Sequence, residues 1–120
     1  MLPAASRLRD PELFRRAIRQ GRRTGSRTLV LHRLASEITA GQGPFAAPSA
    51  QVGLVVSKAV GPAVTRNLVK RRIRASVREL LGELAPADIL VIRATPAAAT
   101  ASYAELSRDL SRCVQKVMTA

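Results

Sequence analysis

The feature that most constrains this chain is the segment 57–78, which contains many basic residues and no acidic residue. It predicts the end of a strand, a turn at Gly61-Pro62 and then a long helix, because apolar residues recur at about 100° per residue along one face. Those apolar residues are Val69, Ile73, Val77, Leu80 and Leu84. A helix of this type buries its apolar face, so we expect the rest of the chain to supply a core for it.

The opposite side of this predicted helix is polar and cationic. It carries Asn67, Lys70, Arg71, Arg74 and Arg78, while Arg72 points sideways, away from the cluster. Like charges one turn apart repel each other by roughly a few tenths of a kcal/mol per pair, so burial of the apolar face or a bound polyanion must compensate. A solvated charged face usually mixes both signs, yet no acid appears before Glu79. We therefore interpret the cluster as a phosphate-binding surface.

The charge of the whole chain supports the same interpretation. The net charge is +12, from 20 Lys and Arg against 8 Asp and Glu in 120 residues. On a small domain this favours a polyanionic partner, most simply a nucleic acid. An anionic membrane is the alternative, but the sequence has no long basic helix with an aromatic-rich apolar face and no run long enough to span a bilayer. No apolar signal region follows Met1-Leu2-Pro3, so we expect a cytoplasmic protein with no membrane partner.

The rest of the chain predicts one α+β domain over residues 1–120, in the order α-β-β-α-β-α. We expect a two-layer α/β sandwich, in which helices cover a sheet of three or four strands. Whether residues 59–60 form a short fourth strand is left undecided. The expected strands are residues 28–34, 51–58 and 88–94. The first helix is expected from Pro11 to Gln20, with Asp10 as its N-cap and Gly21 at its C-cap.

The segments between these elements differ in composition. Residues 1–9 are expected to form a basic extended arm that carries Arg7 and Arg9, and residues 21–27 a basic, flexible loop. Residues 40–50 are rich in Gly, Pro and Ala and predict a mobile hairpin loop. Ser102 and Glu105 predict a capping box that starts the last helix. Its apolar stripe is Tyr103, Leu106, Leu110, Val114 and Val117.

Residues that could carry catalysis do not form a recognisable group. Three of the acids lie at helix starts, where caps and helix dipoles explain them, and no set of carboxylates resembles a metal nuclease. His32 is the only histidine and Cys113 the only cysteine, so neither predicts a metal site or an intrachain disulfide. We expect Cys113 in the core. His32 is expected on a half-exposed strand, and two roles stay open for it: a contact with RNA and that of an ordinary surface histidine. The sequence favours a binding protein over a catalyst.

The basic segment also resembles a known family. Lys58, Val60-Gly61, Ala63-Val64, Arg66-Asn67, Lys70-Arg71 and Arg74 match, in order and spacing, the signature of the bacterial ribonuclease P protein component. The beginning of the chain is similar to the family's opening at Met1-Leu2-Pro3, Arg7-Leu8-Arg9, Phe14 and Arg19-x-Gly21. The resemblance therefore covers nearly the whole chain.

This resemblance implies a fold and a function. The fold is shared with ribosomal proteins and a domain of elongation factor G, and it contains a left-handed β-α-β crossover where general geometry favours a right-handed one. The family implies a protein subunit of ribonuclease P, an endoribonuclease whose RNA subunit uses Mg²⁺ to remove the 5′ leader of precursor tRNA. The implied partners are ribonuclease P RNA, with one protein per RNA, and precursor tRNA. No cofactor is expected on the protein itself.

The resemblance also implies site residues. Those matching the contact with the catalytic RNA are Arg66, Asn67, Lys70, Arg71 and Arg74, and those matching the leader-binding cleft are Phe14, Arg19, His32, Ser57 and Lys58. Ile18 and His32 stand where relatives often have aromatic residues, which leaves Phe14 as the best stacking candidate. Two other classes remain open: an RNA-binding protein without preference for precursor tRNA, and a nuclease that cuts without added RNA.

Overall fold

The computed structural model describes residues 6–34, 50–84 and 88–119. Its elements are α1 (Pro11–Gln20), β1 (Arg22–Gly25), β2 (Leu29–Leu34), β3 (Gln51–Val55), α3 (Ala63–Leu80), β4 (Ile89–Ala94) and α4 (Tyr103–Thr119), with 3₁₀ turns at Leu81–Glu83 and Pro96–Ala99. The predicted loop 40–50 lies, except for Ala50, outside the described residues, as do residues 1–5 of the predicted arm.

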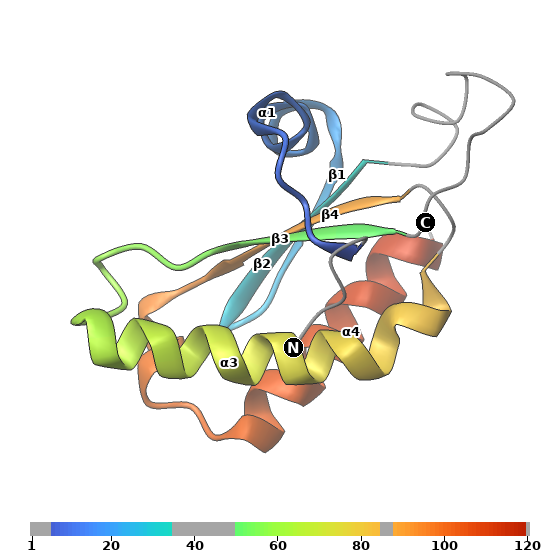
Figure 1. The fold of residues 1–120 in the computed structure, drawn as a ribbon. Helices are drawn as coiled ribbons and strands as arrows, with labels where there is room; N and C mark the ends of the chain where they lie inside the picture. The colour runs from blue at the N-terminus through green and yellow to red at the C-terminus, as the bar shows by residue number, and fades with distance from the viewer. Residues whose placement is uncertain (1–5, 35–49, 85–87, 120) are drawn as a thin grey trace, which may run out of the picture.

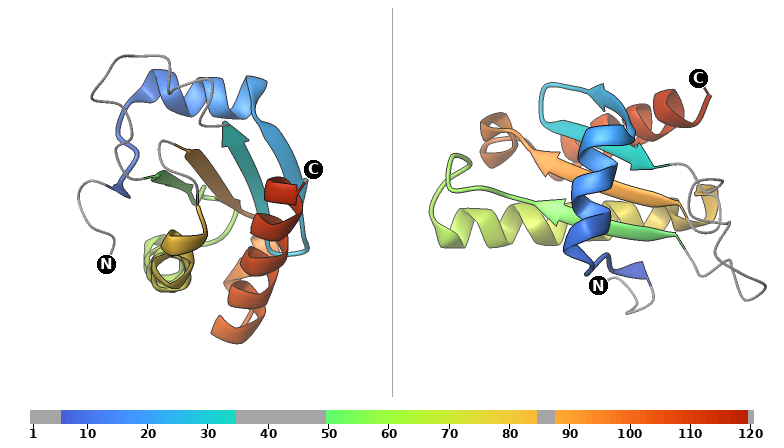
Figure 2. Two further views of the ribbon diagram at one scale, coloured as in Figure 1. Left: turned by 90° about the vertical axis from the view of Figure 1, so that its right-hand side faces the viewer. Right: turned by 90° about the horizontal axis from the view of Figure 1, so that it is seen from above.

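The strands form a single four-stranded sheet in the order β1-β2-β4-β3, and this confirms the α+β class. β2 pairs antiparallel with β1 and β4, whereas β3 and β4 are parallel and are joined through α3. In the right-hand view of Figure 2, α3 lies behind the sheet, β3 and β4 both run to the left, and β4 lies above β3. Seen from the α3 side with these strands pointing up, β4 is therefore to the left of β3, and the crossover is left-handed. The packing of α3 and α4 on one face gives the predicted sandwich, while α1 crosses the opposite face (Figure 1).

The sheet separates two groups of buried apolar side chains. The larger group lies between the sheet and the layer of α3 and α4, and includes Leu31, Leu90 and Ile92. The smaller group lies under α1 and includes Ala17, Leu34 and Val91. Residues 89–92 of β4 are buried on both faces, as their continuous apolar run predicts. The core is aliphatic because the chain has few aromatic residues.

The helix ends follow the predicted chemistry. The Asp10 carboxylate accepts a hydrogen bond from the Glu12 backbone N–H at 2.9 Å, and Pro11 occupies the first turn of α1. At the start of α4, the Glu105 N–H donates to the Ser102 hydroxyl at 3.1 Å, and the Ser102 N–H donates to the Glu105 carboxylate at 3.3 Å. This pair confirms the capping box, and the α4 stripe is buried at Leu106, Leu110, Val114 and Val117.

The fourth strand does not lie at residues 59–60, where a short extra strand was left open, so that alternative is wrong. Residues 59–60 are part of a turn, and the extra strand is β1, which lies within the predicted loop 21–27 and pairs with β2 from Arg22↔Arg33 to Gly25↔Val30. The segment Arg-Arg-Thr-Gly lacks the apolar alternation that identifies a strand. It becomes extended because β2 offers a free edge beside it. The second predicted strand also ends earlier, at Val55 instead of Lys58.

Gly21 allows the close packing between the end of α1 and the sheet. Its backbone is extended (φ −74°, ψ 164°), so it does not act as a left-handed cap. A Cβ at this position would lie 2.4 Å from the Ala17 carbonyl oxygen and 2.5 Å from that of Arg33. Both neighbours are backbone atoms of α1 and β2, and they cannot give way as a side chain can. Glycine is therefore required here because a side chain would collide with these backbone atoms, and not because of its dihedral angles, which any residue can adopt.

We predict that Gly21→Ala lowers the free energy of unfolding by about 1–3 kcal/mol, the usual cost of overpacking. Gly82→Ala is the matched control, because a Cβ there meets nothing within 4 Å. Denaturant unfolding followed by circular dichroism measures both variants. Equal stability of the two variants would contradict the close approach of α1 to β2.

Candidate RNA-binding surface

The surface is built on α3, whose rotation is set by its buried side. Val69 and Ile73 are 1% exposed and Val77 is 2% exposed. On the outer side, Asn67, Arg71, Arg74 and Arg78 are exposed, and Lys70 is half-buried. We call these residues (Asn67, Lys70, Arg71, Arg74 and Arg78) the α3 cationic face. The helical projection from the sequence is confirmed, and the burial of the apolar side holds the cations in fixed positions.

The first turn of α3 is held by its own signature residues. Arg66 is half-buried, and its Nε donates to the Gly61 carbonyl oxygen at 3.1 Å. Gly61 has φ +155°, and a Cβ there would lie 3.2 Å from the Thr65 side chain, so glycine suits this turn. Arg66, expected to contact the catalytic RNA, therefore also links the turn to the helix. This hydrogen bond uses Nε, and the two terminal nitrogens of the Arg66 guanidinium, Nη1 and Nη2, take no part in it.

Lys70 and Arg74 belong to a cleft as well as to the α3 cationic face. The cleft has a volume of about 440 Å³ and lies between α3, β3, the start of α1 and the segment before it. Its lining residues are Arg7, Leu8, Arg9, Phe14, Val52, Gly53, Leu54, Lys70 and Arg74. Four of these are cationic and none is acidic, so the cleft favours an anionic chain.

Phe14 reaches the cleft because Gly53 leaves room for its ring. A Cβ on Gly53 would lie 2.2 Å from the Phe14 Cζ atom, so the ring sits directly against the strand backbone. Phe14 is half-buried and packs on the group of buried side chains under α1. Gly53 has no side chain of its own to cover this face of β3. In the structure, the Phe14 ring occupies that space and replaces bare backbone with an aromatic surface.

The arm before α1 supplies two cations that the site prediction did not include. The Leu8 N–H donates to the Val52 carbonyl at 3.0 Å, and Arg7 forms a parallel bridge with Val52. This pairing on the free edge of β3 places Arg7 and Arg9 at the cleft. Their basic character was visible in the sequence, but the pairing that brings them to Lys70 and Arg74 was not.

His32 lies on the α1 side of the sheet and is not half-exposed as expected. The register aligns Arg23, His32, Val91 and Gly53 across the four strands, so these residues share one face. His32 is 4% exposed, and neither ring nitrogen has a hydrogen-bond partner in the described part of the chain. Burial lowers its pKa, and the charges of Arg23 and Arg93 lower that pKa further. The ring is therefore neutral at pH 7.

The other residues predicted for the leader-binding cleft do not line this cavity. Arg19 is exposed near the end of α1, and Ser57 and Lys58 are exposed between β3 and α3. The Ser57 and Lys58 carbonyls accept hydrogen bonds from Val60 and Gly61 in the turn. The structure thus brings Phe14 together with Lys70 and Arg74, and the other three are exposed residues outside the lining of the cleft.

Arg72 lies on the opposite flank of α3 and has a structural contact. Its Nη1 donates to the Ala101 carbonyl oxygen at 2.9 Å, immediately before α4. The Ser76 hydroxyl also donates to the Ser107 hydroxyl at 3.1 Å. These bonds hold α3 against α4. The sideways direction predicted for Arg72 therefore corresponds to a contact within the protein.

The described residues lack a metal-binding group and a membrane-spanning helix. Residues 6–34, 50–84 and 88–119 contain no group of three or more His, Cys, Asp or Glu side chains that could hold a metal ion. None of the described helices is long and apolar enough to cross a membrane. Cys113 is 1% exposed, and burial raises the pKa of its thiol, as expected for a cysteine in the core.

Comparison with known proteins identifies relatives over the full length. The family model described as Ribonuclease P matches residues 2–118. A ribonuclease P protein component from Nocardioides sp. is 55% identical over 117 residues, covering 98% of this chain and 95% of the relative. One from Streptomyces bikiniensis is 47% identical over 119 residues, covering 98% and 96%.

Solved structures show that the fold is shared at much lower sequence identity. The ribonuclease P protein of Staphylococcus aureus aligns with a TM-score of 0.76 at 21% identity, covering 92% of this chain and 94% of that one. The Thermotoga maritima protein aligns with a TM-score of 0.72 at 17% identity, covering 92% and 96%. At these identities, the structural likeness supports the fold alone.

We predict that Arg71→Ala mainly affects RNA binding and that Arg72→Ala mainly affects stability. Arg71→Ala should weaken RNA binding at fixed salt and leave stability within about 0.5 kcal/mol. Arg72→Ala should lower the free energy of unfolding by about 1–2 kcal/mol through loss of its bond to Ala101, with a smaller effect on RNA binding. Filter binding, under conditions where both variants are folded, measures the affinity for RNA, and chemical unfolding measures the stability. Weaker RNA binding by Arg72→Ala than by Arg71→Ala would contradict this assignment of the two flanks.

Proposed function

This chain belongs to the ribonuclease P protein family, and we propose that it acts as the protein subunit of ribonuclease P, binding both the catalytic RNA and the 5′ leader of precursor tRNA. Membership of this family implies a role in endonucleolytic tRNA 5′ processing. The α3 cationic face is the contact with the catalytic RNA, and the cleft beside it holds the leader. One protein molecule serves each RNA.

The observation that carries this proposal is the shared position of Lys70 and Arg74. Both belong to the α3 cationic face, and both line the cleft together with Phe14 and Gly53. A leader in the cleft therefore lies beside an RNA bound along α3. Cations between two polyanions reduce the repulsion that would otherwise separate them. The protein can in this way increase the affinity of the catalytic RNA for the precursor.

The leader contact relies on backbone charge and shape more than on base recognition. Four cationic side chains reach the cleft, whereas Phe14 is the aromatic residue that lines it. A stacked base contributes about 1–3 kcal/mol, so one aromatic ring gives a limited preference for particular bases. His32 is neutral and buried beneath this face, so it adds no charge to the leader contact.

Catalysis is assigned to the RNA subunit, which uses Mg²⁺. A protein metal nuclease needs several carboxylates that converge on its ions. Among the described residues, Asp10, Asp88 and Glu105 instead accept hydrogen bonds from nearby protein groups. Asp88, which is fully buried, pairs with Arg33 at 3.0 Å and joins β4 to β2. The protein therefore acts through binding, in the cytoplasm where precursor tRNA is made.

The proposal predicts that the protein alone leaves precursor tRNA uncut, while adding it to ribonuclease P RNA lowers the Mg²⁺ concentration needed for cleavage. The assay compares protein alone, RNA alone and the assembled enzyme over a Mg²⁺ titration. Cleavage by pure protein would indicate an autonomous nuclease. Binding to RNA without any effect on cleavage would indicate a general RNA-binding protein.

A second prediction separates the two RNA contacts. Lys70→Ala should reduce the slope of log K against log[salt] for the catalytic RNA by about one unit. Phe14→Ala should leave that slope unchanged and reduce the preference of the assembled enzyme for precursor over mature tRNA, because it removes an apolar contact in the cleft. Unchanged precursor preference in Phe14→Ala would exclude stacking at this residue.

Phe14→Leu is the control for packing, because Phe14 also contacts buried side chains under α1. Leucine keeps an apolar side chain over Gly53 but removes the aromatic face. If both variants lose precursor preference and Phe14→Leu keeps the thermal stability of the parent, the ring acts on the leader. If Phe14→Leu keeps full preference, Phe14 has a packing role.

A further inference from the structure

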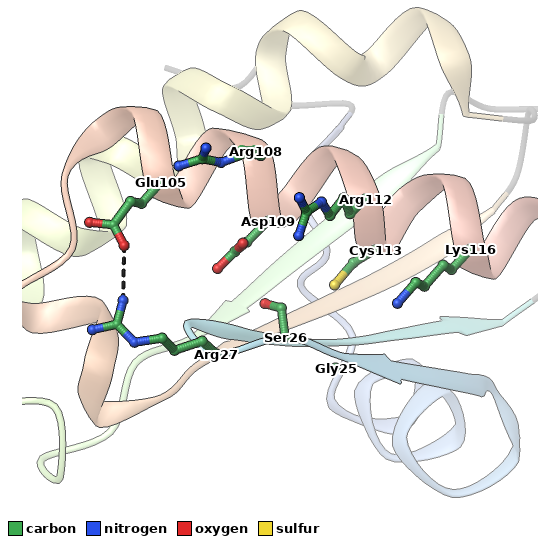
Figure 3. A pocket seen from close by; sticks show the side chains of 9 residues that line it. All are labelled: Gly25, Ser26, Arg27, Glu105, Arg108, Asp109, Arg112, Cys113 and Lys116. Atoms are coloured by element: carbon green, nitrogen blue, oxygen red, sulfur yellow. Dashed lines mark hydrogen bonds and ion pairs between the residues drawn. The ribbon is translucent and has the colours of Figure 1, made fainter.

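A second cationic surface lies at the other edge of the sheet. A pocket of about 450 Å³ opens between the β1–β2 turn and α4. Its cations are Arg27 from the turn and Arg108, Arg112 and Lys116 from α4, and we call these four residues the α4 cationic face. The three α4 residues follow one another at intervals of four, so they lie along one side of the helix (Figure 3).

The acids in this pocket are already bonded within the protein. Glu105 pairs with Arg27 at 2.8 Å and also accepts the Ser102 N–H. Asp109 accepts the Thr28 hydroxyl at 2.6 Å. Within the described residues, Arg108 and Arg112 form no ion pair, and both are exposed. The pocket therefore presents more positive than negative charge, with two arginines available to an outside anion.

The walls of the pocket are held in place before any ligand binds. The Thr28–Asp109 and Arg27–Glu105 bonds connect the turn to α4. The turn itself is closed by the Ser26 N–H, which donates to the Leu29 carbonyl at 2.8 Å, and the Thr95 hydroxyl donates to the Arg27 carbonyl at 2.7 Å. A site whose groups are ordered in advance loses less entropy on binding.

The α4 cationic face is separate from the surface assigned to the proposed function. It lies against edge strand β1, whereas Lys70 and Arg74 border edge strand β3. Strands are about 4.8 Å apart, so the two edges of this sheet are separated by about 14 Å. Helix α4, which carries three of the four residues of this face, lies in the same layer as α3, on the side of the sheet opposite α1 (Figure 1).

We infer that the α4 cationic face binds the phosphate backbone of a second segment of the catalytic RNA. This inference rests on the proposed function. Arginine suits the site because its planar guanidinium can form two hydrogen bonds to one phosphate. The catalytic RNA is the fitting occupant because it already contacts α3 in this layer, while the leader lies at the cleft beside β3. The Arg72–Ala101 and Ser76–Ser107 bonds keep the two helices, and so the two RNA contacts, in fixed relation.

The test measures the salt dependence of binding between the full-length protein and ribonuclease P RNA. Arg112→Ala should reduce the slope of log K against log[salt] by about one unit, and the double variant Arg108→Ala, Arg112→Ala by about two. Arg112→Lys should keep the slope, because the charge is retained. Arg15→Ala on α1 is the matched control, since Arg15 is an exposed helical arginine and its loss changes the net charge equally. Its slope should equal that of the parent.

The outcomes separate this inference from the proposed function. If Lys70→Ala lowers the slope and the double variant does not, the inference is overturned and the proposed function stands. If the double variant keeps the slope but loses preference for precursor over mature tRNA, the face binds the substrate and the inference is again wrong. If the parent does not bind ribonuclease P RNA, the proposed function fails. Thermal unfolding of every variant is measured, and a destabilised double variant is replaced by the two single variants.

Discussion

The burial of one side of α3 is the constraint on which the rest of the structure depends. Val69, Ile73 and Val77 lock the rotation of this helix against the sheet. Because side chains leave a helix at fixed angles, that rotation also decides that Lys70 and Arg74 face the cleft and that Arg72 faces α4. The energy of apolar burial thus holds together a row of like charges, which an isolated helix would disfavour.

The strand order distributes the basic residues over two edges of one sheet. β3 is an edge strand. The segment before α1 pairs with it at Val52, and the Phe14 ring of α1 packs on it at Gly53. β1 is the opposite edge strand, and α4 lies beside it (Figure 2). A net charge of +12 on a 120-residue chain is therefore arranged as separate surfaces, each with its own geometry. This arrangement is suited to a polyanionic partner that reaches more than one surface of the protein.

Local signals predicted the helices well and the polar strand poorly. Asp10-Pro11 and Ser102-x-x-Glu105 marked helix starts because their side chains bond to backbone groups within three residues. β1 was missed because its pairing with β2 supplies the only reason for Arg22–Gly25 to be extended. His32 was expected to be half-exposed because its burial depends on the two neighbouring strands, β1 and β4, and on α1, none of which its own segment specifies.

The sequence by itself determined which side of α3 is buried, which side is cationic, and where the capped helices begin. These features depend on residue spacing and on bonds between near neighbours in the chain. The tertiary structure alone decided that Arg7 and Arg9 join Lys70 and Arg74 around one cleft, that Gly53 receives the Phe14 ring, and that Arg27 lies beside Arg108 and Arg112. Such contacts join residues far apart in the sequence, so they follow from strand order and packing and not from any local pattern.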